Sequence, residues 1–280
     1  MSATGPGDTI GPYVLRSQLG EGGMGRVFLA DRPPAVERYA VKVIRDELAS
    51  DPAITRRFLR EAEATSRVRH PRLIEVVEAG ADAGRPYLAM RHIDGASLDR
   101  LVKDRGPLEL AAGTTIMADA AGALDALHGA GLVHRDIKPS NIMVDGDGRA
   151  TLMDLGLARG PEMSVLTKTN AVVGTVGYLA PELIRGSADA SPASDIYALG
   201  CVAFEAFAGR PPFVGGMFEV GLGHLEHPPP DIHAIRPELP ETLSEAVSLA
   251  LAKSPERRPR TATAFAMMLR VGAGLAPGLG

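Results

Sequence analysis

The apolar residues of this 280-residue chain change their spacing about a third of the way along it. Before residue 93, short runs rich in β-branched and aromatic residues predict strands. These runs are Tyr13–Leu15, Val27–Ala30, Tyr39–Ile44 and Tyr87–Met90. One amphipathic helix is expected among them, near Ala53 to Val68. From about Ser97 onward, helical spacing dominates. The sequence therefore predicts an α+β fold, with a small sheet lobe over residues 12–93 and a larger, mainly helical lobe over residues 94–271.

Two helices of the second lobe have clear sequence signals. Apolar residues recur at intervals of three and four between Leu108 and Leu127. A second helix should run from Ala193 to Ala208, because Ser191 and Pro192 suit its start and Gly209 suits its end. Both chain ends, residues 1–11 and 272–280, are rich in Gly, Pro and Ala, so we expect a disordered tail and a flexible tail or linker.

Composition excludes several classes of protein. With 30 Lys and Arg against 34 Asp and Glu, the net charge of −4 gives no basic field for nucleic acid. The single cysteine, Cys201, lies in an apolar run and cannot form an internal disulfide or a zinc site, which favours a reducing compartment. The sequence shows neither a leader peptide nor the ~20 apolar residues of a membrane helix. We therefore expect no membrane span within this chain and a cytoplasmic location, free or as part of a longer membrane-anchored protein.

The stretch from His134 to Asn141 reads His-Arg-Asp-Ile-Lys-Pro-Ser-Asn. A polar run with a proline is usually a surface turn, but all eight residues together are hard to explain in that way. The octet resembles the catalytic loop of protein kinases, and the lysine two places after Asp136 matches the Ser/Thr-directed form. The resemblance implies that Asp136 orients or accepts the proton of the attacking hydroxyl and that Lys138 neutralises charge on the phosphoryl group.

A glycine motif precedes the octet. The segment from Leu19 to Val27 contains G-x-G-x-x-G, which occurs in dinucleotide-binding folds, in phosphate-binding hairpins and in ordinary turns. A dinucleotide site would need a helix after the glycines, and no helical spacing follows Gly25. A hairpin whose backbone N–H groups approach phosphates is the better interpretation.

Lys42 lies inside an apolar strand, where a lysine needs an explanation. It could point to solvent from an edge strand. By resemblance to the Val-Ala-Ile-Lys element of kinases, it could instead bind the α and β phosphates and pair with a carboxylate. Glu61 is the expected partner and Glu63 its rival; two residues apart on one helix, they face about 200° from each other.

Asp154 follows an apolar strand and precedes a leucine and a glycine, as in the D-F-G element of kinases with Leu155 in place of Phe. An isolated Asp-x-Gly is usually a turn. Here it comes after the octet and a hairpin signal at Asp145–Gly148, which favours a functional role for Asp154 over that of an ordinary turn residue. Carboxylate and amide oxygens suit Mg²⁺, so the resemblance assigns Asn141 and Asp154 to the metal.

Together these motifs identify the chain, over about residues 12–271, as similar to the bacterial eukaryotic-like branch of Ser/Thr protein kinases. The resemblance implies a two-lobed kinase fold with an antiparallel sheet in the first lobe, ATP as donor, Mg²⁺ with Mn²⁺ as a substitute, and protein substrates bearing Ser or Thr. The catalytic residues would be Asp136, Lys138 and Asn141. The expected ATP-binding residues are Leu19, Gly20, Gly22, Gly23, Met24, Gly25, Val27, Ala40, Lys42, Glu61, Met90, His92 and Met143.

The resemblance also assigns scaffold and regulatory residues. Glu182 should pair with Arg258, and Asp195 should hydrogen-bond the catalytic-loop backbone. His134 and Leu155 would pack in the core that switches between active and inactive forms, and Thr175 would be a structural hydroxyl near Asp136 and Lys138. The expected phosphosites, modified by a second copy in trans through a transient dimer, are Thr167 and Thr169, with Arg135 as receiver of the phosphate.

Three positions depart from the family pattern. Leu155 is a conservative apolar change that should leave Asp154 able to bind metal. Arg91 replaces an acidic residue at the adenine hinge, where the contacts are made by backbone groups. Thr65 places a small polar group where a larger apolar one is usual, which predicts a looser helix around Glu61 and low basal activity.

Two other functions stay open at this point. A pseudokinase would lack Lys42, Asp136 or Asp154, and none is missing. A small-molecule kinase shares the Asp and Asn loop, but the segment from Gly174 to Glu182 resembles the peptide-docking part of protein kinases.

Overall fold

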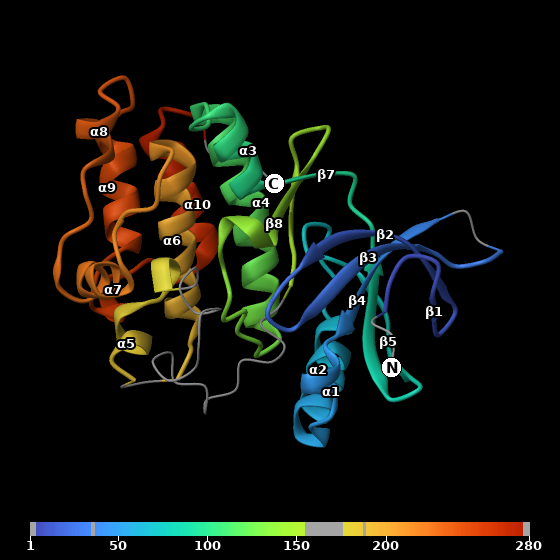
Figure 1. Ribbon diagram of the computed structural model, residues 1–280. Helices are drawn as coiled ribbons and strands as arrows, with labels where there is room; N and C mark the ends of the chain where they lie inside the picture. Colours follow the sequence, from blue (N-terminus) through green and yellow to red (C-terminus); the bar gives the residue numbers. More distant parts are fainter. Residues whose placement is uncertain (1–3, 35–36, 155–175, 187–188, 277–280) are drawn as a thin grey trace. The chain divides into compact units, whose positions relative to one another are not determined.

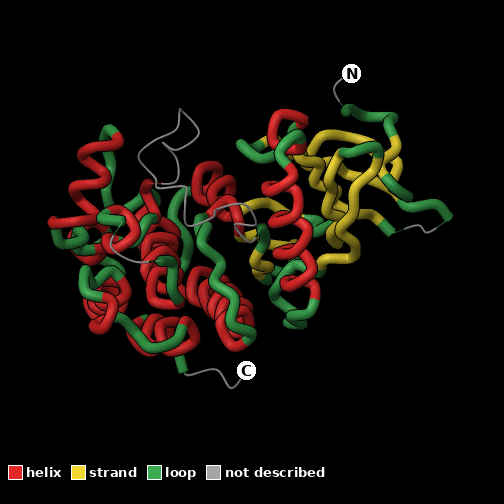
Figure 2. Tube along the Cα trace, turned by 90° about the horizontal axis from the view of Figure 1, so that it is seen from below, coloured by secondary structure: helices red, strands yellow, loops and turns green. Residues whose placement is uncertain are grey.

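The computed structural model describes residues 4–34, 37–154, 176–186 and 189–276. The chain divides into two compact units. The first takes Met1–Arg69 and Ile74–Asp94, and the second takes His70–Leu73 and Gly95–Gly280. Figure 2 shows that strands prevail in the first unit and helices in the second.

The first unit contains a six-stranded sheet in the order β1-β2-β3-β4-β6-β5, in which every neighbouring pair is antiparallel (Figure 1). Its strands are β1 Thr9–Ile10, β2 Tyr13–Glu21, β3 Gly25–Asp31, β4 Arg38–Ile44, β5 Val76–Asp82 and β6 Arg85–Arg91. The β2–β3 register shifts twice, between Leu15 and Ser17 and between Gln18 and Gly20. Such irregularities bend a strand and increase its twist, so β2 curls along its length.

Helix α2 (Pro52–Ser66) packs on β5 and β6, and the shorter α1 (Asp46–Ala49) precedes it. Asp51 caps α2 by accepting the N–H of Ala53, and Pro52 at the first helical position needs no partner for its nitrogen. Phe58, Ala62 and Thr65 are buried at helical spacing. The helix predicted near residues 53–68 is therefore present, and α1 is an additional element.

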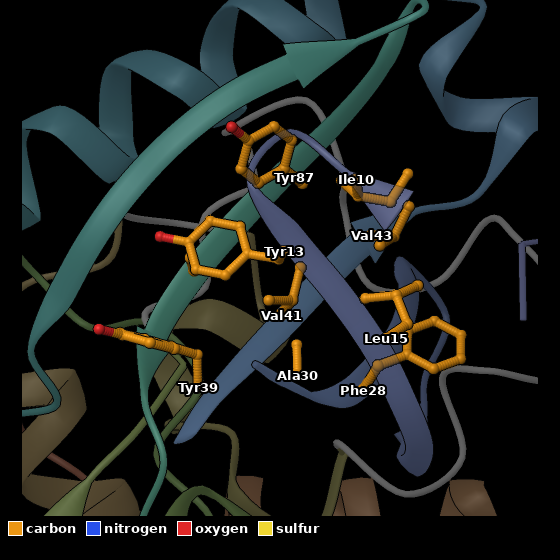
Figure 3. Packing of buried hydrophobic residues seen from close by; sticks show 10 residues of the cluster. Ile10, Tyr13, Leu15, Phe28, Ala30, Tyr39, Val41, Val43 and Tyr87 are labelled. Carbon is orange, nitrogen blue, oxygen red and sulfur yellow. The ribbon is translucent and has the colours of Figure 1, made fainter. Parts of the chain in front are cut away.

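Side chains from five strands form a buried apolar cluster on one face of this sheet (Figure 3). Tyr13 lies edge-on to Tyr39 and Tyr87, with ring centroids 5.4 and 6.1 Å apart. Ile10, in β1, is fully buried in the same cluster. The prediction of a disordered tail through residue 11 is wrong for this segment, because β1 pairs with β2 and its isoleucine belongs to the core.

The second unit is mainly helical, with a small sheet in the order β7-β8-β9. Its strands are β7 Gly95–Ser97, β8 Ile142–Asp145 and β9 Ala150–Leu152. Its α-helices are α3 Leu98–Arg105, α4 Leu110–Gly129, α5 Pro181–Ile184, α6 Pro192–Ala208, α7 Met217–Glu226, α8 Ile232–Ile235, α9 Glu241–Ala250 and α10 Ala262–Gly272. Single 3₁₀ turns occur at η1 Pro139–Asn141, η2 Val176–Tyr178 and η3 Pro255–Arg257.

Helix α6 confirms the prediction from its capping residues. The Ser191 side chain accepts from the Ser194 N–H in a capping box, and Gly209 ends the helix with φ of 76°, where glycine carries no steric cost. The helix is buried along most of its length and packs against α4 and α9. It is the central element of the second unit.

The end of α10 corrects the predicted C-terminal boundary. The carbonyl of Gly272 accepts a hydrogen bond of 2.7 Å from the Thr242 hydroxyl, and the Leu275 N–H donates to the carbonyl of Arg270. Residues 272–275 therefore close this helix rather than starting a tail. Within the described residues, no helix is both long and apolar enough to cross a membrane.

Candidate active site

Three predicted catalytic side chains meet in the loop between α4 and β8. The Lys138 ammonium lies 2.8 Å from Oδ2 of Asp136. The amide nitrogen of Asn141 donates to the Asp136 carbonyl at 2.7 Å and to its Oδ2 at 3.1 Å. Both of these groups are acceptors, so the nitrogen must face Asp136 and the amide oxygen faces away from it. The carboxylate is thus oriented by an ammonium and an amide from its own loop.

Asp195, near the start of α6, holds the backbone of this loop. Its carboxylate is almost fully buried and accepts the N–H groups of His134 at 2.8 Å and Arg135 at 2.9 Å. A ring nitrogen of His128 lies 2.9 Å from the same carboxylate. Arg135 has φ of 67°, a left-handed conformation that a non-glycine residue keeps only where its surroundings hold it. The predicted contact between Asp195 and the loop is therefore present.

His134 is a buried bridge rather than an acid or base. Burial lowers the pKa of its imidazole, so the ring is neutral at pH 7. Its Nδ1 accepts the N–H of Asp136 at 3.3 Å, and its Nε2 is 2.9 Å from the Met153 carbonyl. Since Nδ1 accepts, Nε2 carries the proton and donates it. The histidine ties the catalytic loop to the residue before Asp154.

The β8–β9 hairpin brings Asn141 and Asp154 to the same end. Ile142 opposes Leu152, and the Met153 N–H donates to the Asn141 carbonyl at 2.8 Å. Asp154 has φ of 44°, which turns the chain directly after the strand. A carboxylate and an outward-facing amide oxygen are the donors that Mg²⁺ prefers, so this pair fits the predicted metal.

The glycine motif forms the hairpin between β2 and β3, and the Gly22 N–H donates to the Gly25 carbonyl at 2.9 Å. A side chain at Gly25 would collide with the carbonyl oxygen of Val43 in β4, whereas Gly20 and Gly22 have open space beside them. Strands β3 and β4 follow the glycines, and no helix does. The hairpin itself is confirmed and the dinucleotide fold is excluded, while the approach of its N–H groups to phosphates stays a prediction. Leu19 and Gly23 are exposed on this hairpin, and Met24 is half-buried.

Lys42 lies in the interior of the first unit's sheet. It opposes Val27 of β3 on one side and Leu88 of β6 on the other. The alternative of an exposed edge strand is therefore wrong. Ala40 and Met90 oppose each other and are both buried.

The two acidic residues of α2 differ in exposure. Glu63 is exposed and pairs with Arg67 at 2.7 Å, one helical turn further on. Glu61 is half-buried on another face of the helix. The Thr65 hydroxyl is buried and donates to the Glu61 carbonyl at 2.9 Å, so its polar group is satisfied within the helix. Exposure therefore favours Glu61 over Glu63 as partner of Lys42, and that pairing stays a prediction.

Two expected nucleotide residues, His92 and Met143, lie outside these motifs, as does the hinge residue Arg91. Arg91 is exposed at the end of β6, and its N–H donates to the Glu75 carbonyl. His92 follows it and is half-buried. Met143 lies in β8 of the second unit, opposite Thr151.

The expected pair between Glu182 and Arg258 is present and buried. Two guanidinium nitrogens of Arg258 lie 2.7 and 2.8 Å from the Glu182 carboxylate oxygens. Arg258 also donates to the carbonyls of Ala252, Ala193 and Lys253. A two-pronged pair of this kind fixes the start of α5 to the turn before α10.

Four predicted residues lie outside the described part of the chain: Leu155, Thr167, Thr169 and Thr175. One group that the sequence analysis missed is Asp119 of α4. Its buried carboxylate accepts from Arg149 and from the Ala150 N–H, at the start of β9. A charged residue between the apolar Met117 and Ala120, on a helix with a long buried face, was the available signal.

Comparison with known proteins agrees with this geometry. The family model described as "Protein kinase domain" matches residues 13–267. A probable serine/threonine-protein kinase of Thermomonospora curvata, PkwA, is 42% identical over 265 residues, which cover 94% of this chain and 35% of that protein. The serine/threonine-protein kinase PknA of Mycobacterium tuberculosis is 37% identical over 262 residues, covering 91% of this chain and 60% of PknA.

Among solved structures, the kinase domain of Mycobacterium tuberculosis PknI matches with a TM-score of 0.79 at 34% identity. The match covers 98% of this chain and all of that domain. The chain spans between about a third and three fifths of the two curated relatives above, and the family match runs through both structural units. The predicted two-lobed kinase fold is confirmed, and the chain belongs to the protein kinase domain family.

Proposed function

We propose that this chain is a serine/threonine protein kinase domain, which transfers the γ-phosphate of ATP to Ser and Thr hydroxyls of proteins. The observation that carries the proposal is the contact of Lys138 and Asn141 with one carboxylate, that of Asp136, in a chain of the kinase family. These are the residue types that phosphoryl transfer uses to position the hydroxyl and balance the charge.

The transfer breaks the bond between the γ-phosphorus and the oxygen that bridges it to the β-phosphate, and forms a bond from the acceptor oxygen. Asp136 orients the acceptor hydroxyl and takes its proton. Lys138, 2.8 Å from that carboxylate, is placed to offset negative charge on the moving phosphoryl group. Asn141 and Asp154 are the residues that would hold Mg²⁺, which would neutralise negative charge on the phosphates.

Residues of the first unit would bind the nucleotide. Lys42 would pair with its phosphates and be held by Glu61. The glycine hairpin, with exposed backbone at Gly22 and Gly23, would cover them. ATP as donor also favours the cytoplasm, which stays a prediction.

A protein acceptor is favoured by the relatives, which are named as serine/threonine-protein kinases.

We further propose that the domain phosphorylates itself at Thr167 and Thr169, through transient contact between two copies. Arg135, held next to Asp136 by the buried Asp195, would receive the phosphate. The catalytic loop would then both carry out phosphate transfer and bind the phosphate that activates it.

The test is incorporation of phosphate from γ-labelled ATP into the protein itself and into a casein-type substrate. Asp136→Asn should lower incorporation by at least about a hundredfold, because the group that orients the hydroxyl loses its charge. Asp147→Asn, at the exposed turn between β8 and β9, is the matched control and should retain activity.

Three results would contradict these proposals. Equal incorporation by Asp136→Asn and the wild-type protein would refute the mechanism. A wild-type protein that binds ATP but transfers nothing would indicate a nucleotide-binding scaffold, and transfer only to small molecules would indicate a small-molecule kinase. Peptide mapping that finds neither Thr167 nor Thr169 modified would refute the assigned phosphosites.

A further inference from the structure

We propose that Asp119, a buried carboxylate in α4, is a positioning residue that sets the place of Asp154 and so the affinity for the divalent cation. The inference rests on the proposed function, because it needs a cation at Asn141 and Asp154. It deepens that function by naming a residue that acts on the site through other residues.

Several donors converge on the Asp119 carboxylate, whose side chain is only 7% exposed. The Arg149 guanidinium donates to both oxygens, at 2.9 Å from Nε and 2.7 Å from Nη2. The backbone N–H of Ala150 donates at 2.9 Å, and Nε of Arg72 lies 3.6 Å away. A buried charge is stable only where such partners compensate its lost hydration, and a two-pronged guanidinium pair is among the strongest of them.

These partners hold β9 at both of its ends. Ala150 is the first residue of the strand, and its N–H is the one that Asp119 accepts. Leu152 is the last, and its N–H donates to the Arg72 carbonyl at 2.8 Å. Leu73 forms a parallel bridge to Leu152. The segment that carries Arg72 is itself tied to Asp119, so one carboxylate anchors β9 to α4 directly and through a neighbouring segment.

The position of β9 in turn determines where Asp154 lies. Ile142, the first residue of β8, opposes Leu152, the last residue of β9. Asn141 directly precedes β8 and Asp154 lies two residues after the end of β9, so both lie at the same end of the hairpin. The bond from the Met153 N–H to the Asn141 carbonyl joins the two ends. Only Met153 separates the strand from Asp154, so a shift of β9 along β8 would move Asp154 away from Asn141.

A purely structural Asp119 would make a different prediction. Its loss would lower the free energy of unfolding, while the folded protein would bind cations as before. A positioning residue must also change the cation affinity of the folded protein, and this is the quantity to measure.

The experiment is titration of the protein with MnCl₂ at saturating AMP-PNP, following free Mn²⁺ by electron paramagnetic resonance. The substitution Asp119→Asn hardly changes the side-chain volume, but it removes the negative charge that holds Arg149. We expect the Mn²⁺ dissociation constant to rise about tenfold, the lower part of the range for residues that orient metal ligands. AMP-PNP binding measured without metal should be unchanged.

Arg149→Gln is a second variant in case Asp119→Asn fails to fold. The Arg149 side chain is 44% exposed, and its replacement leaves the bond from the Ala150 N–H to Asp119 in place. We expect a smaller rise in the same dissociation constant. The control is Asp231→Asn, which removes a carboxylate that caps α8 and accepts the Ser244 hydroxyl, and which makes no hydrogen bond or ion pair to β9 within the described part of the chain. Its Mn²⁺ affinity should equal that of the wild-type protein.

The inference is overturned if folded Asp119→Asn, or folded Arg149→Gln where the first does not fold, binds Mn²⁺ within about twofold of the wild-type protein. It is also overturned if the wild-type protein with AMP-PNP binds no Mn²⁺. Failure of the proposed function looks different: the wild-type protein would bind Mn²⁺ and AMP-PNP yet transfer no phosphate. In that case the comparison of dissociation constants still decides the role of Asp119.

Discussion

Removal of Arg258 should cost the fold several kcal/mol although the residue lies outside the catalytic loop. Its side chain is fully buried and its two-pronged pair with Glu182 has distances of 2.7 and 2.8 Å. It also donates to the carbonyls of Ala252, Ala193 and Lys253, at 2.8, 2.9 and 3.2 Å. Arg258→Met keeps much of the volume and deletes all of these donors.

The size of this free-energy loss follows from the groups that lose Arg258 as their partner. Removal of one partner of a buried ion pair costs about 3–5 kcal/mol, and each partly buried carbonyl that loses its donor adds to that cost. Total stabilities of domains are about 5–15 kcal/mol, so the loss is a large fraction of the whole. At about 2–4 °C per kcal/mol for a chain near this size, the melting temperature should fall by roughly 10 °C.

The assay is urea unfolding followed by circular dichroism, with Arg257→Met as the control. Arg257 is the adjacent residue and is exposed, so its replacement should change the free energy of unfolding by no more than about 0.5 kcal/mol. The double variant Glu182→Leu/Arg258→Met should recover part of the loss, because the buried carboxylate is removed as well. If Arg258→Met unfolds within about 1 kcal/mol of Arg257→Met, the reasoning from burial and pairing is wrong.

Two further predictions concern stability. Gly25→Ala should destabilise the fold by about 1–3 kcal/mol, because the added methyl group meets the carbonyl of Val43, whereas Gly22→Ala meets open space; equal melting temperatures for the two variants would contradict this. His224 is fully buried, and burial is the first cause that lowers the pKa of its imidazole to about 4. The unfolded chain therefore takes up the proton first as the pH falls, so stability is complete above about pH 6.5 and is lost between about 6.5 and 4. Between pH 7.5 and 5 the loss from this group is about 2 kcal/mol, and His224→Asn, whose amide oxygen can still accept the Tyr197 hydroxyl, should be less sensitive to acid by that amount. Parallel urea titrations at the two pH values measure it, and equal losses in both proteins would contradict it.

Local chemistry explains which elements could be predicted from the sequence. Helix α6 was predicted because Ser191, Pro192 and Gly209 act within their own turns of chain. Strand β1 was missed because a two-residue strand has no periodicity, and only its pairing with β2 and the burial of Ile10 reveal it.

The candidate site divides in the same way. Asp136, Lys138 and Asn141 lie within one loop, so their spacing alone predicted that they meet. The central place of Lys42 depends on β6, which follows the intervening helix α2. Asp119 was missed because its partners, Arg72 and Arg149, come from segments on either side of α4. A contact between segments far apart in sequence leaves no mark in the spacing of either one.

The short segment His70–Leu73 has a consequence for the order in which the chain can fold. It belongs to the second unit, although the residues on both sides of it belong to the first. During synthesis this segment leaves the ribosome before α4 and β9, so Leu73 lacks its pairing partner until Leu152 has been synthesised. Neither unit is continuous in sequence. A cut at residue 94 would leave Leu73 and the Arg72 carbonyl on the first fragment, although both pair with Leu152 on the second. Experiments that divide this chain should therefore include residues 70–73 in the fragments of both units, or should use the whole chain.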